Sequence, residues 1–149
     1  MKPFRSVIFL EKFMKIYKTE NEIKTLVESF ENGTISEADW RHAEHLVVAL
    51  FYLSNHDFET ALAKMRAGIF NLLRAFKVDL TKEMPYHETL TVFWMRAVDD
   101  FSNKQSGTPL PEICNALVKK FDKDYPFKFY TREHLFSEKA RAEFVEADL

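Results

Sequence analysis

The sequence is poor in cysteine, glycine and proline. A single cysteine, Cys114, among 149 residues excludes an intrachain disulfide and a zinc site made of several thiolates, and it is typical of a reducing compartment. Three glycines and five prolines are too few for a turn-rich all-β fold, and they favour long helices joined by few loops. We therefore expect an all-α protein in the cytoplasm.

The sequence also lacks a long apolar run and an excess of charge of one sign. No stretch approaches the roughly 18 consecutive apolar residues of a membrane span, and the first residues have no signal-peptide cleavage pattern. A net charge of -2 provides no basic field to hold the backbone of a nucleic acid. We expect neither a membrane span nor nucleic-acid binding.

Large apolar side chains are abundant. Apolar residues make up 46% of the chain and aromatic residues 15%, with 15 phenylalanines, which predicts a core filled by rings. A chain of this length buries roughly 70% of the surface that its unfolded form exposes. Because no internal repeat or low-complexity linker divides the chain, we predict a single helical domain over residues 1–149.

Capping residues and the spacing of apolar residues predict a bundle of about five to six helices. Thr19 to Glu22 have the form of a capping box. The expected helices after the first segment cover residues 19–31, 36–54, 57–77, 85–101 and 109–121. Ser36 would cap the central 36–54 helix and Pro85 would stand in the first turn of the 85–101 helix, while Gly68 would permit close approach of a neighbour. Thr131 and Ser137 precede short helical turns in an apolar tail, which we expect to dock on the bundle.

The segment from Pro3 to Lys18 alternates apolar clusters with basic residues. This pattern is typical of an amphipathic helix, and we interpret it as a first helix that packs on the core with its lysines in water. The alternative is a contact with a membrane surface or a partner.

Three histidines form the group of residues that indicates a functional site. His42 and His45 are three residues apart, so on a helix they share a face and can reach a common ion. His87 aligns with the apolar stripe of the 85–101 helix and should face the interior. Three imidazoles from two helices would leave a coordination position open, as catalytic zinc sites do. Glu44 or Glu88 would then act as ligand or general base.

The leading hypothesis is therefore a divalent metal, whether zinc, iron, nickel or manganese, bound between the 36–54 and 85–101 helices. Such a site would support metal-assisted hydrolase or transferase chemistry. The alternative is a metal-free binding module, in which the histidines and Glu88 form a polar network beside a pocket for a small molecule or a protein partner. We interpret His56 as a loop or capping residue. His134 would join a site only if the C-terminal tail docks over the end of the bundle. An aromatic helix surface would equally suit a homodimer.

Three motifs also carry a resemblance. They are W-R-H-A-E-H-L at 40–46, Y-H-E-T at 86–89, and Y-T-x-x-x-L-x-S-x-x-A-R at 130–141 followed by F-V-E-A-D-L. Together they resemble a family of small bacterial all-helical proteins of uncharacterised function. Pro85, Phe144 and Ala147 depart from that family, which has Gly, Trp and Pro there. The resemblance implies that His42, His45, His87 and Glu88 belong to one site. A looser similarity, at the level of the fold, links the chain to DinB-like bundles.

Overall fold

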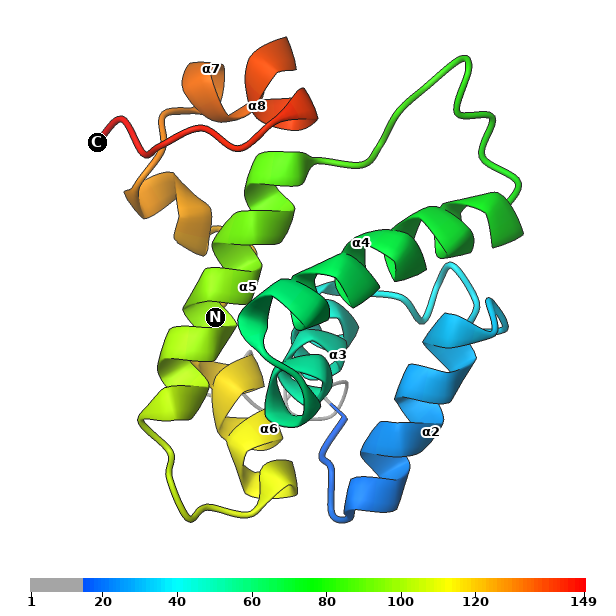
Figure 1. The fold of residues 1–149 in the computed structure, drawn as a ribbon, viewed down its shortest axis with the longest axis vertical. Coiled ribbons are helices and arrows are strands. Elements are labelled where there is room, and N and C mark those ends of the chain that lie inside the picture. The colour runs from blue at the N-terminus through cyan, green and yellow to red at the C-terminus, as the bar shows by residue number, and fades with distance from the viewer. Residues whose placement is uncertain (1–14) are drawn as a thin grey trace, which may run out of the picture.

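The computed structural model describes residues 15–149, and within this range every regular element is a helix (Figure 1). The longer helices are α2 (Glu20–Glu31), α3 (His42–Asn55), α4 (Phe58–Ala75), α5 (Glu88–Asn103) and α6 (Leu110–Lys120). The short ones are η1 (Tyr125–Lys128), α7 (Arg132–Leu135) and α8 (Glu138–Ala142). The predicted all-α bundle with a tail of short helices is confirmed. Among the described residues, no helix combines the length and the apolar character that crossing a membrane requires.

The basic segment predicted from Pro3 to Lys18 lies outside the described residues except for its last four. Residues 15–18 have an extended or irregular backbone, and they precede the capping box of α2. That capping box is present as predicted, with Thr19 accepting from the amide of Glu22 and Glu22 reaching back to the amide of Thr19.

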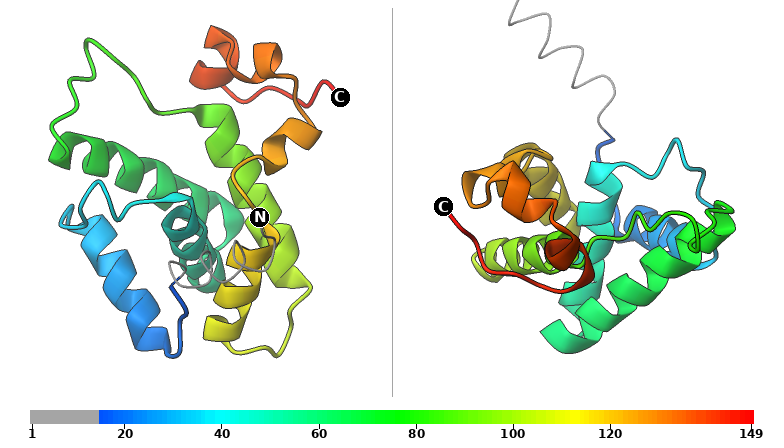
Figure 2. Two further views of the ribbon diagram at one scale, coloured as in Figure 1. Left: turned by 180° about the vertical axis from the view of Figure 1, so that it is seen from behind. Right: turned by 90° about the horizontal axis from the view of Figure 1, so that it is seen from above.

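α3 lies at the centre of the bundle. α2, α4, α5 and α6 all pack against it, and Figure 2 shows α4 running at a steep angle to it. The five consecutive residues from Leu46 to Leu50 are at most 2% exposed. A helix that is apolar all round is stable only when it is enclosed on every side, which explains why the most apolar stretch of the chain forms this element.

α2 and α4 meet at a position where only glycine fits. A Cβ at Gly68 would lie 2.3 Å from Cε2 of Phe30, which is completely buried. The ring of Phe30 also contacts Trp40: the two rings are stacked, with their centroids 4.7 Å apart. The close approach of the two helices therefore sets the position of Trp40, just before α3.

The C-terminal segment docks on the first turn of α5, where Figure 1 shows α8 beside it. The hydroxyl of Thr89, which is fully buried, donates to the carbonyl of Glu143 at 3.0 Å and accepts from the amide of Val145 at 3.1 Å. A small second core fills the space beneath, made of Tyr130, Leu135, Ala140 and Val145. The docking predicted from the apolar tail is confirmed.

Two predicted helix starts are wrong. Residues 36–40 form turns, in which the hydroxyl of Ser36 accepts from the amide of Asp39, and α3 begins only at His42. The cause is Glu44, whose carboxylate accepts from the amide of Arg41 at 3.1 Å and fixes the helix start there. α5 begins at Glu88 rather than at position 85, because His87 supplies the cap.

Candidate functional site

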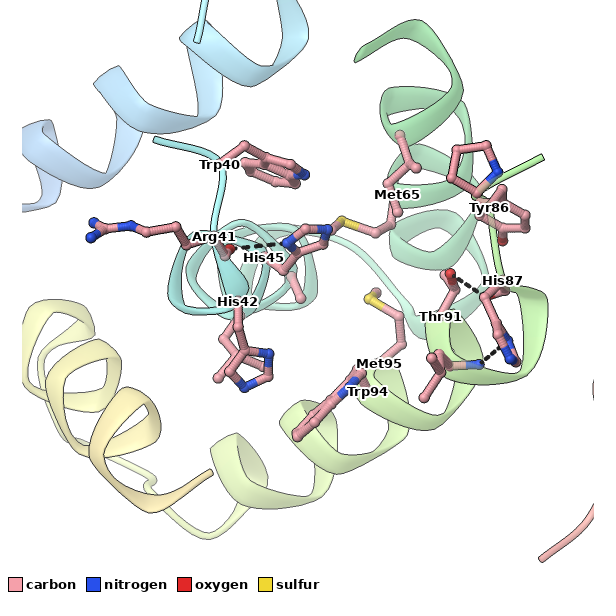
Figure 3. A pocket seen from close by; sticks show the side chains of 15 residues that line it. Trp40, Arg41, His42, His45, Met65, Tyr86, His87, Thr91, Trp94 and Met95 are labelled. Atoms are coloured by element: carbon pink, nitrogen blue, oxygen red, sulfur yellow. Dashed lines mark hydrogen bonds between the residues drawn. The ribbon is translucent and has the colours of Figure 1, made fainter. Parts of the chain in front are cut away.

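A pocket of about 350 Å³ opens between α3, α4 and the first turns of α5. Its walls are mainly thioethers and rings, as Figure 3 shows for Trp40, Met65, Tyr86, Trp94 and Met95. All three predicted ligand histidines also line it. The volume and the apolar lining with a few polar groups are those of a small-molecule site.

His45 stands at the wall of this pocket. Its Nδ1 lies 3.0 Å from the carbonyl oxygen of Arg41, and its ring lies 4.1 Å from that of Trp40. A carbonyl oxygen only accepts, so Nδ1 carries the proton and Nε2 of the neutral ring carries a lone pair. Burial lowers the pKa of His45 from 6.5 to about 4, which favours that neutral ring.

His42 points in a different direction (Figure 3). Its Nε2–H donates to the carbonyl oxygen of Phe121 at 3.1 Å, and its ring packs edge-on against Trp94 with centroids 4.7 Å apart. Burial lowers the pKa of this histidine as well. His42 and His45 therefore share the first turn of α3, but each is oriented by a different backbone carbonyl.

His87 caps α5. Its Nδ1 accepts from the amide of Leu90 at 3.2 Å, and its Nε2–H donates to the carbonyl oxygen of Leu135 at 2.8 Å. The side chain is buried, as the apolar spacing predicted, and desolvation lowers its pKa. Both ring nitrogens are therefore engaged within the protein. His87 starts α5 and fastens the C-terminal segment to this helix.

The two predicted general bases lie outside the pocket. Glu44 is buried and pairs with the guanidinium of Arg41 at 2.9 Å. Glu88 pairs with Arg66 and accepts from the hydroxyl of Tyr86 at 2.5 Å. Burial, followed by that hydrogen bond, raises the pKa of Tyr86 to about 12. Both carboxylates pair with arginines, and neither lines the pocket.

The remaining candidates lie elsewhere. The exposed His56 follows α3, and Nε2 of His134 bonds to the carbonyl oxygen of Glu146 at 2.8 Å. Neither lines the pocket. Cys114 is completely buried, and desolvation raises its pKa to about 12, so it is part of the core.

A metal would need its ligands to converge. Within residues 15–149, no three histidine, cysteine, aspartate or glutamate side chains are grouped closely enough to share an ion. His42 and His45 each keep one nitrogen free of hydrogen bonds to described residues, whereas His87 would have to give up its cap. The three-histidine metal site stays a prediction.

Sequence reasoning missed what the pocket walls are. Helical spacing assigns Trp40 and Trp94 to core packing and Met65 to a buried stripe; all three do pack in or against the core, and they also line the pocket. Apolar periodicity cannot separate these roles, because a side chain at the rim of a cavity has the same spacing as one in the core. The available signal is the presence of Trp94 on the same face of the helix as His87.

Comparisons with known protein families, with curated proteins and with solved structures give no match. The pocket is therefore the feature from which a function can be inferred.

Proposed function

We propose that the protein is a helical binding module whose pocket between α3, α4 and α5 takes a small molecule. The observation that carries this proposal is the pocket itself, about 350 Å³ of mostly apolar space beside an imidazole. A cavity of about 150 Å³ already accepts benzene, so this volume is sufficient for two fused rings. No metal is required by this proposal, because apolar burial and a hydrogen bond to a free imidazole nitrogen are enough to hold a small molecule.

The two predicted carboxylate bases are committed to pairs within the protein, which favours binding over carboxylate-assisted hydrolysis. Arg41 is neutralised by Glu44, and Tyr86 donates to Glu88. A carboxylate acts as general base only where it reaches the reacting water, and neither of these two carboxylates lines the space. Because these groups already bond to one another, they contribute little to recognition, and the pocket would select ligands mainly by their shape.

Filling the pocket should abolish binding. We expect 2-naphthol, added to ¹⁵N-labelled protein, to shift the amide resonances of residues on the pocket walls. Replacement of the half-buried Ile69, which lines the pocket, by Trp should remove these shifts. The matched control is Leu73→Trp, one turn further along α4 and outside the pocket. Shifts that survive Ile69→Trp, or that are absent from the wild type, would contradict the proposal.

The second candidate is the metal-assisted hydrolase or transferase predicted from the sequence. The observation in its favour is that His42 and His45 lie three residues apart in the first turn of α3, each with one nitrogen not bonded to a described residue. Release of His87 from its cap would supply the third ligand.

For this second candidate, we expect elemental analysis of untagged protein to find one equivalent of zinc, iron, nickel or manganese. The metal should be lost in both His42→Ala and His87→Ala and retained in His56→Ala, which changes an exposed histidine. Retention at full stoichiometry in His87→Ala would exclude the three-histidine site.

A further inference from the structure

We infer that the ligand of this pocket is a neutral aromatic molecule with one hydrogen-bond donor, of the phenol class, whose hydroxyl donates to Nε2 of His45. The inference rests on the proposed function and specifies it. It follows from the orientation of the His45 ring, from the accessibility of its Nε2 atom, and from the charges that surround the pocket.

The ring of His45 is held in one tautomer. The bond from Nδ1–H to the carbonyl oxygen of Arg41 fixes both the proton and the ring plane. Figure 3 shows the opposite edge of the ring turned towards Met65, across the pocket. The protein therefore presents an oriented acceptor to whatever occupies this space.

This acceptor is open to the pocket. The described residues contain no enclosed side-chain nitrogen or oxygen that lacks a hydrogen-bond partner, and none of them bonds to Nε2 of His45. Nε2 must consequently be reached by solvent, and the pocket lies directly beside it. A ligand that excludes this water without replacing its hydrogen bond leaves a buried acceptor unpaired, which weakens binding. A ligand with a donor at this point avoids that cost.

The charges favour a neutral ligand. Among the described residues, Arg41 is the only charged side chain on the pocket wall, and its guanidinium is held by both carboxylate oxygens of Glu44. None of the described carboxylates lines the space to balance an ammonium group. The walls offer instead the thioethers of Met65 and Met95 and the indole of Trp94, which are soft, polarisable partners for a flat ring.

The test compares two probes of nearly the same shape, 2-naphthol and 2-methoxynaphthalene, by isothermal titration calorimetry. Only 2-naphthol can donate. For the wild type we expect 2-naphthol to bind about tenfold more tightly, the difference that one hydrogen bond makes. In His45→Phe the ratio of the two affinities should fall to about one. His56→Phe, the same change at an exposed histidine outside the pocket, should keep the wild-type ratio.

A second measurement does not depend on a variant that folds. The ¹⁵N resonance of Nε2 in His45 should move on addition of 2-naphthol and stay in place with 2-methoxynaphthalene. Equal affinities for the two probes in the wild type would overturn the donor inference and leave the pocket proposal standing. Tighter binding of benzyltrimethylammonium than of 2-naphthol would overturn the neutral ligand. Failure of both naphthalene probes to bind would reject the inference together with the proposed function.

Discussion

Replacing Gly68 with Ala should destabilise the protein by about 1–2 kcal/mol, although Ala is favoured over Gly in a helix by about 1 kcal/mol. The added methyl would lie 2.3 Å from Cε2 of Phe30. Phe30 is completely buried and stacked on Trp40, so it has no free space to move into. Urea denaturation monitored by circular dichroism measures this loss of unfolding free energy.

Phe30, the residue that the new methyl group would meet, provides the control. Phe30→Leu removes the ring atoms that the methyl would meet, so the double variant should be more stable than the sum of the two single changes predicts. The clash also bears on the pocket, because displacement of Phe30 moves Trp40, which packs against His45 at 4.1 Å. Binding of 2-naphthol should weaken in Gly68→Ala. If Gly68→Ala alone were more stable than the wild type, α2 and α4 would not be closely packed at this position.

The free energy of unfolding should fall as the pH is lowered from about 6.5 to about 4. Burial lowers the pKa of His42, His45 and His87, to about 4 for His45. In this window the unfolded chain binds protons that the folded chain does not, so acid favours unfolding, and the stability is fully present above the ordinary histidine pKa. One such group contributes a slope approaching about 1.4 kcal/mol per pH unit.

Comparison of variants isolates His45 from the other titrating groups. Urea denaturation of His45→Gln across this pH range should give a shallower slope than the wild type, while His56→Gln, at an exposed position, should match the wild type. The groups nearest to His45 are Arg41, His42 and Glu44, of which Arg41 and Glu44 neutralise each other. An unchanged slope in His45→Gln would mean that this imidazole binds a proton equally well in the folded and the unfolded chain.

Composition and local capping are sufficient to predict the class of fold. Scarce glycine and proline indicate the all-helical class, and the capping box at Thr19 and the caps at Thr131 and Ser137 are present where the sequence predicts them. These signals act over three or four residues, so they can be read without knowledge of the tertiary structure. The division into helices follows from them.

The start of the central helix and the arrangement of the site depend on longer-range contacts. Ser36 has the chemistry of a cap, but Glu44 fixes the start of α3 several residues beyond the expected one because it pairs with Arg41. The partners of His42 and His87 are carbonyls of Phe121 and Leu135, which are distant in sequence. A backbone carbonyl has no sequence signature, so spacing alone could not distinguish a ring held by the backbone from one held by an ion.

The attachment of the C-terminal segment to α5 has a consequence for the order of folding. The hydrogen bonds of His87 and Thr89 to this segment span 48 to 56 residues, whereas α3 and α4 are joined by a very short connection. Long loops close at a greater entropic cost than short ones, so contacts between near neighbours form first. The wall of the pocket contributed by Tyr86 and His87 is therefore fixed only after α3 and α4 have packed together, so the pocket takes its final shape late in folding.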